Sequence, residues 1–139
     1  MASKKEVQRF LDNQKSIQFY PIARKVFNTV FGAMSKEEFD KATNNLILMV
    51  LHEGAIAQVM HFPRKGKIKV LQLTIPTKAP LPVLCYIIAH EAGHVLQGRN
   101  WMKSDGQKLE EDAEDYARRL GFPRTPSIDR WIKKYRTKF

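Results

Sequence analysis

The residues best suited to chemistry are His90, Glu91 and His94, which form the sequence His-Glu-Ala-Gly-His within an apolar stretch. On a helix, positions four apart lie one turn apart on the same face, so both imidazoles can reach one metal ion at about 2.0–2.1 Å. Glu91 is rotated by about 100° from His90, which places it to act on a water molecule rather than as a ligand. The spacing therefore predicts a zinc site with a general base beside it.

A zinc site that keeps one position open for water needs a third protein ligand. Five acidic residues lie in residues 110–115. Helical geometry places Glu110 about 75° from the centre of the apolar stripe of this segment, Glu114 about 115° from it, and Glu111 almost opposite. Glu110 is therefore the predicted third ligand and Glu111 the predicted solvent-facing acid. Acidic residues in the first turn also stabilise a helix by interacting with its dipole. This effect does not explain why one acidic side chain would face inward.

The histidine motif is followed by a second, more discriminating motif. Residues 87–94 read Ile-Ile-Ala-His-Glu-Ala-Gly-His, and Glu110-x-x-Ala-x-x-Tyr-Ala begins after fifteen intervening residues. Together the motifs resemble those of the gluzincin metallopeptidases, most closely the ImmA/IrrE-type and minigluzincin proteins, over about residues 67–123. The resemblance implies that His90, His94 and Glu110 hold zinc and that Glu91 is the catalytic base. It does not carry over a substrate, because the short segment 98–103 leaves little wall for a specificity pocket.

The elements that must position these residues follow from apolar spacing and from breaker residues. Helical patterns with caps or breakers at their ends predict helices over residues 4–14, 21–31, 35–50, 80–97, 104–120 and 127–135. The predicted end signals include a capping box at Ser35–Glu38, a C-terminal cap at Gly98 and an N-terminal cap at Ser127. Gly93, inside a predicted helix, is expected to mark the close approach of another group. Alternating residues around a turn at 63–66 predict a hairpin over residues 57–75. We expect one α+β domain over residues 1–139. Its predicted form is a small zincin-like fold with N-terminal helices, a short antiparallel sheet, the HExxH helix, a glutamate-bearing helix and a C-terminal helix.

The predicted strand 67–75 gains a role if the zinc lies beside it. An edge strand can bind an extended peptide by main-chain hydrogen bonds, which positions the peptide carbonyl. The predicted substrate-binding residues are Lys67, Lys69, Leu71 and Leu73. Lysines here would favour acidic residues on one side of the cut, although charges on an edge strand also suppress aggregation.

Other notable residues have plainer interpretations. His52 and His61 lie outside the ligand spacing and are predicted to be a helix-end or loop residue and a strand residue, either of which can stabilise an oxyanion if it folds near zinc. Cys85 lies about 140° around the helix from His90 and is predicted to fill the core, as is Tyr86.

The charge of the chain is concentrated in two segments. Residues 63–78 hold five basic and no acidic residues, and residues 124–139 hold six basic and one acidic, so the two carry the whole net charge of +10. Such segments predict at most a weak, sequence-independent contact with nucleic acid.

The composition also indicates the cellular compartment in which the protein is expected. One cysteine cannot form an intrachain disulfide, and the N-terminus lacks an apolar leader. The longest apolar stretch, 46–60, is interrupted by polar residues and falls short of the ~20 residues of a membrane span. We therefore expect a cytoplasmic protein with no membrane segment.

The function predicted from these patterns is that of a small zinc metalloendopeptidase acting on a peptide or protein substrate. The alternative is a non-enzymatic, zinc-stabilised basic module that binds nucleic acid. A third assignment, a ferrous site with two histidines and one carboxylate, is disfavoured because Glu91 has no role there.

Overall fold

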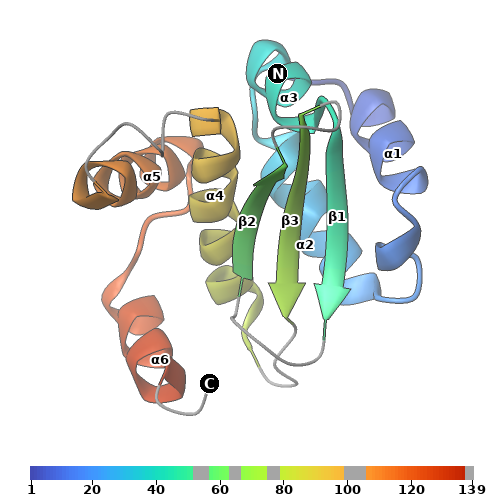
Figure 1. Cartoon of the computed structure of the whole chain (residues 1–139). Coiled ribbons are helices and arrows are strands. Elements are labelled where there is room, and N and C mark those ends of the chain that lie inside the picture. Colours follow the sequence, from blue (N-terminus) through green and yellow to red (C-terminus); the bar gives the residue numbers. More distant parts are fainter. Residues whose placement is uncertain (52–56, 63–66, 75–78, 99–105, 137–139) are drawn as a thin grey trace.

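The computed structural model describes residues 1–51, 57–62, 67–74, 79–98 and 106–136. In these residues the chain forms six α-helices, one short 3-10 helix and a three-stranded sheet (Figure 1). The predicted α+β class is therefore confirmed.

Three helices form the N-terminal part of the molecule. They are α1 (Lys4–Asp12), α2 (Pro21–Gly32) and α3 (Lys36–Thr43), with the 3-10 helix η1 (Lys15–Ile17) between the first two. Ser35 and Glu38 form the predicted capping box at the start of α3, because each side chain bonds the other residue's backbone N–H. Phe27 and Phe31 of α2 are fully buried and belong to the single large hydrophobic core.

The sheet is mixed rather than purely antiparallel. Its strands are β1 (Leu46–Leu51), β2 (Ala57–Phe62) and β3 (Ile68–Thr74), in the order β1-β3-β2. The predicted hairpin is confirmed in its described part, since β2 pairs antiparallel with β3 and Val59 lies opposite Leu71. On its other side, β3 pairs in parallel with β1, with Leu48 opposite Leu71. The predicted hairpin turn, 63–66, lies outside the described residues.

Strand β1 corrects the prediction of a helix that continues to Val50. Helix α3 ends at Thr43, and Asn45 adopts a φ of 57°, a left-handed conformation that a helix cannot include. Beyond it, Leu46, Leu48 and Val50 are buried in alternation with more exposed neighbours, as in a strand with one face on the core. The apolar spacing of residues 46–50 fits both a helix and a strand, and pairing with β3 selects the strand.

The outer edge of β1 is closed by side chains rather than by another strand. The Gln14 amide donates to the carbonyl of Leu46 and accepts from the N–H of Leu48, at 3.2 and 2.9 Å. The Ser16 hydroxyl accepts from the N–H of Val50 at 2.9 Å. Since exposed strand edges invite further pairing, these bonds block β1 as a docking edge.

The C-terminal half supplies the helices that carry the motif residues. They are α4 (Leu81–Gln97), α5 (Gly106–Leu120) and α6 (Pro126–Arg136). Gly98 ends α4 with a φ of 61°, as its predicted capping role requires. Helix α6 begins one residue before the predicted cap Ser127; the hydroxyl of Thr125 instead accepts from the N–H of Ile128 at 3.2 Å.

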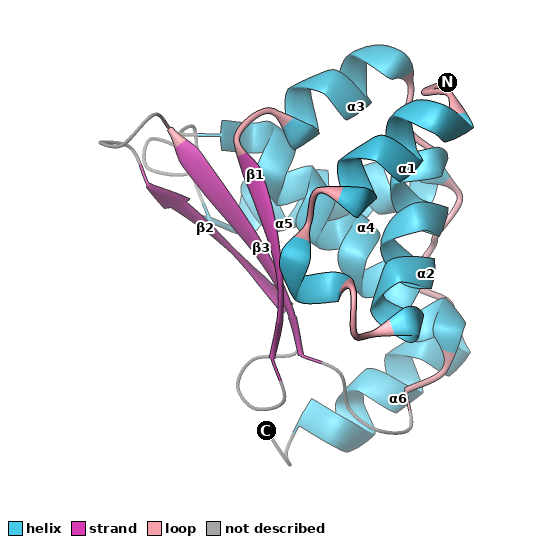
Figure 2. Cartoon of the chain, turned by 90° about the vertical axis from the view of Figure 1, so that its right-hand side faces the viewer, coloured by secondary structure: helices cyan, strands magenta, loops and turns pink. Residues whose placement is uncertain are grey.

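The helices stack on one face of the sheet, and α4 lies beside its β2 edge (Figures 1 and 2). Helix α4 packs against α2, α3, α5, α6, β2 and β3, so the helix that bears the histidines is also the centre of the core. Among the described helices, none combines the length and apolar character needed to cross a membrane.

Candidate metal centre

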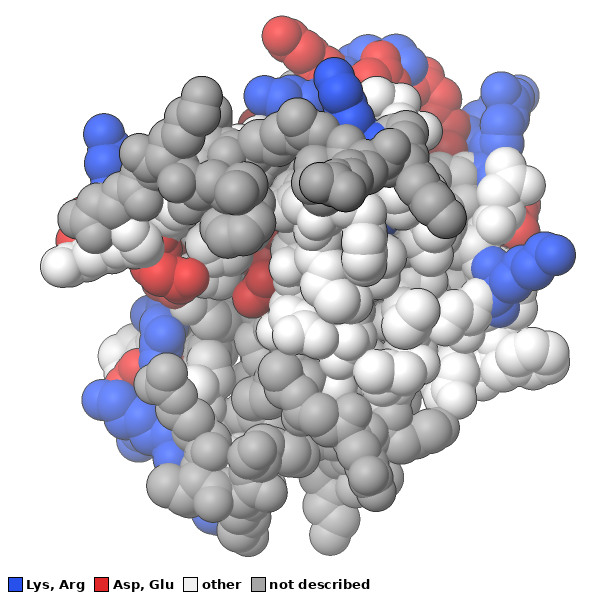
Figure 3. Space-filling view, in the orientation of Figure 1, with Lys and Arg blue, Asp and Glu red and all other residues white. Residues whose placement is uncertain are grey.

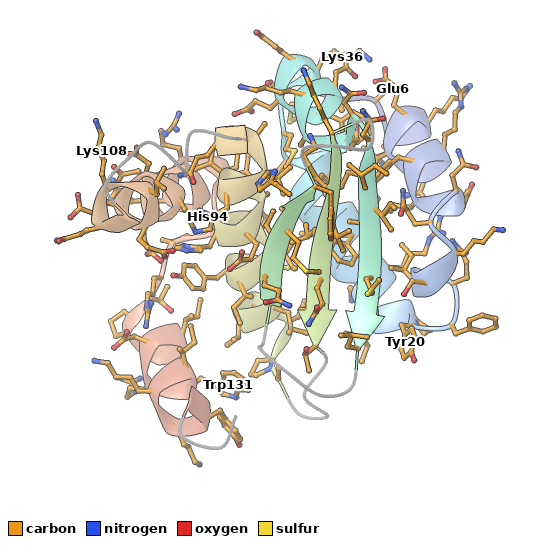
Figure 4. The ribbon with its side chains drawn as sticks, in the orientation of Figure 1. Glu6, Tyr20, Lys36, His94, Lys108 and Trp131 are labelled. Carbon is orange, nitrogen blue, oxygen red and sulfur yellow. The ribbon has the colours of Figure 1, made fainter. Side chains whose placement is uncertain are left out.

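The two histidines lie on the face of α4 that meets α5. Their ring centroids are 4.9 Å apart, and both side chains are largely buried, with exposed fractions of 12% for His90 and 19% for His94. Figure 4 shows the His94 side chain between α4 and α5. The i, i+4 spacing therefore places both rings on one side of the helix, as predicted.

Glu110 of α5 joins the two histidines across the helix interface. One carboxylate oxygen lies 2.9 Å from His90 Nε2 and the other lies 3.0 Å from His94 Nε2. One ligand atom from each of the three residues lies within 4.8 Å of the other two. Glu111, by contrast, is exposed and accepts from the Gln107 amide at 3.3 Å. The structure thus brings the three predicted ligands together, while the metal itself stays a prediction.

Gln97 determines which nitrogen of His94 carries a proton. Its amide nitrogen donates to the carbonyl of Leu109 at 2.8 Å, so its amide oxygen is the atom that faces His94 Nδ1, also at 2.8 Å. That oxygen can only accept, which requires a proton on Nδ1 and leaves Nε2 as the lone-pair nitrogen of a neutral ring.

A neutral His94 would therefore face the Glu110 carboxylate with a lone pair at 3.0 Å. Two acceptors at this distance repel each other unless a positive charge lies between them, either a second ring proton or a metal ion. Two imidazole nitrogens and one carboxylate are a donor set that zinc prefers in open sites. The residues present therefore fit a zinc ion.

His90 is held from its other side by Glu114. A Glu114 oxygen lies 2.9 Å from His90 Nδ1, but Nδ1 has no aligned hydrogen-bond partner in the described structure. The same oxygen accepts a short hydrogen bond from the Tyr86 hydroxyl. Burial, followed by the Glu114 carboxylate, raises the pKa of Tyr86, so this hydroxyl stays a donor. Carboxylates beside the second nitrogen of a metal-bound histidine orient the ring.

Gly93 allows α5 to approach the histidine helix. A Cβ at this position would lie 3.0 Å from the Ala113 Cα and 3.4 Å from the Tyr116 Cβ. Because a backbone atom cannot yield as a flexible side chain can, only glycine fits here without displacing α5. The expectation that Gly93 marks a close approach is thus confirmed, and the group that approaches is the helix bearing Glu110.

Glu91 faces a cleft rather than the three ligands. It lines this cleft together with His94 and Glu110, and it does not belong to the ligand cluster. Burial, with a smaller contribution from the Glu110 carboxylate, raises the pKa of Glu91 to about 8. Its carboxyl is therefore poised to carry a proton near neutral pH in the metal-free protein.

The cleft has a volume of about 620 Å³ and lies between α4, α5 and the edge strand β2. It is called the metal cleft below, and its described lining is residues 57–61 of β2, Glu91, His94 and Gln97 of α4, and Gly106, Leu109 and Glu110 of α5. In the described part of the chain, β2 pairs only with β3, so its other edge faces away from the sheet.

The predicted substrate strand is corrected by this topology. Strand β3 is central and pairs on both sides, so it has no edge to offer a peptide. Leu71 and Leu73 are fully buried in the core. Neither they nor Lys67 and Lys69 belong to the described lining of the metal cleft. The sequence showed two strands of a hairpin but not which of them a third strand would cover.

Sequence reasoning underestimated four residues around the site. Gln97, Glu114 and Tyr86 position the histidines, and His61 lines the metal cleft from β2. Spacing on α4 could have indicated Tyr86 and Gln97, since they lie four residues before His90 and three after His94. His61 is a strand residue, as predicted, but only β pairing brings it to the metal cleft, which spacing along the chain does not show. Cys85 is buried, as predicted, and His52 lies outside the described residues.

Comparisons of the chain with family models, with curated proteins and with solved structures returned no match. The assignment of function therefore depends on the geometry of the residues themselves.

Proposed function

We propose that this chain is a small zinc-dependent peptidase of the gluzincin type. The observation that carries the proposal is the convergence of His90, His94 and Glu110 beside a cleft that His94, Glu110 and Glu91 line. Two positioned histidines, one carboxylate ligand and a separate acid are the parts that hydrolysis at an open zinc site requires.

The roles of the residues follow from their positions. His90, His94 and Glu110 would hold the ion, and bound zinc supplies the Lewis-acid chemistry that polarises a peptide carbonyl. Glu91 accepts a proton on its carboxylate as water attacks the carbonyl carbon. It then passes this proton to the nitrogen of the breaking C–N bond, so that the amine leaves neutral.

Strand β2 is suited to hold the substrate. Its outer edge borders the metal cleft, whereas the opposite edge of the sheet is closed by Gln14 and Ser16. An extended peptide on β2 would gain main-chain hydrogen bonds beside the ligands, which positions its carbonyl for attack. The binding edge proposed here replaces the β3 edge expected from the sequence.

The zinc content and activity of two variants test the proposal. The wild type should bind about one Zn²⁺ per chain and cleave members of an unbiased peptide library. Glu91→Gln should keep the zinc and the fold but lose hydrolysis by about 100-fold or more, because the proton acceptor is gone. His94→Ala should lose zinc and activity together.

Elemental analysis, circular dichroism and mass spectrometry of the digests give these readouts. Cleavage by Glu91→Gln at the wild-type rate would contradict the mechanism. Zinc binding without any cleavage by the wild type would instead favour the alternative, a zinc-stabilised module that binds nucleic acid. Iron rather than zinc in the metal analysis would favour the ferrous site.

A further inference from the structure

A second cavity lies directly beside the metal cleft. It has a volume of about 310 Å³ and lies where the end of α3, the start of β3, the end of β2 and the end of α4 meet. Its charged lining, in the described residues, consists of Lys41, Lys67 and Lys69, with no acid among them. This cavity is called the basic pocket below.

None of the three lysines of the basic pocket forms an ion pair within the described part of the chain. Lys69 Nζ instead donates to the backbone carbonyl of Lys41 at 3.0 Å, which holds its ammonium in place. Burial and then the charge of Lys41 lower the pKa of Lys69, as expected for a cation that lacks a counter-ion.

The backbone at Lys67 is also unusual. Its φ of 57° lies in the left-handed region, where glycine or asparagine is favoured and a long side chain is uncommon. Local backbone preference therefore does not explain a lysine at this position. Residues held in such conformations cluster at sites where a side chain must face a ligand.

The basic pocket and the metal cleft are joined along β2. His61 lines both of them, while residues 57–60 line only the metal cleft and Phe62 lines only the basic pocket. A peptide extended along β2 advances by about 3.3 Å per residue, so one chain would pass from the cleft into the pocket within a few residues.

We propose that the basic pocket binds a carboxylate of the peptide substrate, so that the enzyme prefers peptides with an acidic group within a few residues of the cleaved bond. The inference rests on the proposed peptidase function and adds to it the class of substrate. Lysine ammonium groups attract a carboxylate as point charges, and the partly buried site strengthens this attraction over that in bulk water.

The surroundings favour a peptide over a nucleic acid as the source of the anion. Helix α5, across the metal cleft, exposes the acids Glu110, Glu111, Asp112 and Asp115. In Figure 3 red surface of acidic residues lies at α5, beside the sheet. A phosphate backbone that continued from the basic pocket across the cleft would meet these charges and be repelled, whereas a peptide needs only one acidic group at the pocket.

Paired peptides test the inference through the ratio of their kcat/KM values. The parent is a peptide that the enzyme cleaves in the library, acetylated at its N-terminus and amidated at its C-terminus. Its variants carry either Glu or Gln at each position in turn. One further peptide has a free C-terminal carboxylate as its only acidic group. We expect the wild type to prefer Glu at one position by about tenfold. If the enzyme prefers only the peptide with the free C-terminal carboxylate, the basic pocket binds the C-terminus of the substrate rather than an acidic side chain.

The variants separate the basic pocket from general charge effects. Lys41→Gln with Lys67→Gln should remove the preference, since both side chains are exposed enough to be replaced without unfolding the protein. Lys67→Glu should reverse it toward Lys-containing peptides. Lys5→Gln with Lys25→Gln, at exposed positions of α1 and α2, changes the net charge by as much as the double variant of the pocket and should leave the preference unchanged.

A binding measurement distinguishes failure of this inference from failure of the proposed function. Fluorescence anisotropy would compare the binding of labelled Glu and Gln peptides, and of a labelled oligonucleotide, to the Glu91→Gln protein.

The outcomes differ for the two proposals. Cleavage of all peptides at equal rates overturns the carboxylate pocket but supports the peptidase. Lysine-dependent binding of Glu peptides without cleavage by the wild type supports the pocket and overturns the peptidase. Lysine-dependent binding of the oligonucleotide alone overturns the carboxylate assignment.

Discussion

At the scale of single residues, the candidate site depends on which atoms of each imidazole face inward. Gln97 and Glu114 lie beside the Nδ1 atoms of His94 and His90, so both Nε2 atoms face the carboxylate of Glu110. A rotated ring would point its lone pair away from the ligand cluster. The supporting residues are therefore as necessary to the proposed zinc site as the ligands.

The acids of α5 should differ sharply in their effect on zinc affinity. Glu110→Ala should weaken zinc binding by about 100-fold or more, because it removes a ligand. Glu114→Ala, which loses the contact to His90 and the hydrogen bond from Tyr86 but no ligand, should cost about tenfold, and the exposed Glu111→Ala should cost nothing. Titration against a competing chelator ranks the three variants. A dominant effect of Glu114 would show that the ligand lies one turn later.

Gln97→Ala should also weaken zinc binding, by about 10–100-fold, because the His94 ring loses the acceptor that fixes its tautomer. Gln107→Ala is the matched control, since it removes a glutamine whose amide donates to the exposed Glu111. The same chelator titration measures both. An unchanged affinity in Gln97→Ala would mean that packing alone orients the ring.

At the scale of elements, the site is made by the contact between α4 and α5. Neither helix holds all three ligands, and at Gly93 an added Cβ would lie 3.0 Å from the backbone of α5 at Ala113. Strand β2 adds the third wall of the metal cleft. The proposed chemistry thus depends on helix spacing as much as on the motif.

Gly93→Ala should destabilise the protein by about 1–3 kcal/mol, because the new methyl group lies against the Ala113 backbone. It should lower zinc affinity as well, since α5 carries Glu110. Gly32→Ala is the control: a Cβ there meets nothing within 4 Å, and the change should stabilise α2 by about 0.4–1 kcal/mol. Urea unfolding of the zinc-free proteins measures both changes. Equal stability of the two variants would contradict the close-packing argument.

At the scale of the whole molecule, α6 is tied to the site through Arg124. Its guanidinium pairs with Asp129 of α6 at 2.8 Å and donates to the Tyr86 hydroxyl at 3.5 Å. Tyr86 in turn donates to Glu114, which contacts His90. The C-terminal helix therefore supports the histidine helix rather than standing apart from it.

Removal of residues 128–139 should lower the free energy of unfolding by at least about 1.5–3 kcal/mol, because Ile128 is buried and Trp131 and Ile132 pack against the core. Ile128→Ala should reproduce much of this loss without deleting the helix. Thermal melts and peptide cleavage rates check both variants. A truncated protein that melts unchanged and cleaves faster would show that the segment is inhibitory instead.

Much of the candidate site could be predicted from the sequence because the spacing of its residues along single helices already places them on one face. The i, i+4 histidines and the placement of Glu110 on the face of its helix that meets them follow from helical periodicity, which acts over one or two turns. The start of α3 and the end of α4 followed from the capping box at Ser35 and from Gly98 in the same way. These features need no knowledge of what the helices pack against.

Tertiary pairing decided the rest. Leu46, Leu48 and Val50 fit a helical stripe and a strand alike, and only β3 beside them selects the strand. The same third strand makes β3 central and leaves the β2 edge to the metal cleft. It also places His61 between the cleft and the basic pocket. The sequence by itself determined which residues are the proposed ligands and the proposed base, whereas only the tertiary structure decided which strand edge lies beside them, because strand order depends on contacts between segments far apart in the chain.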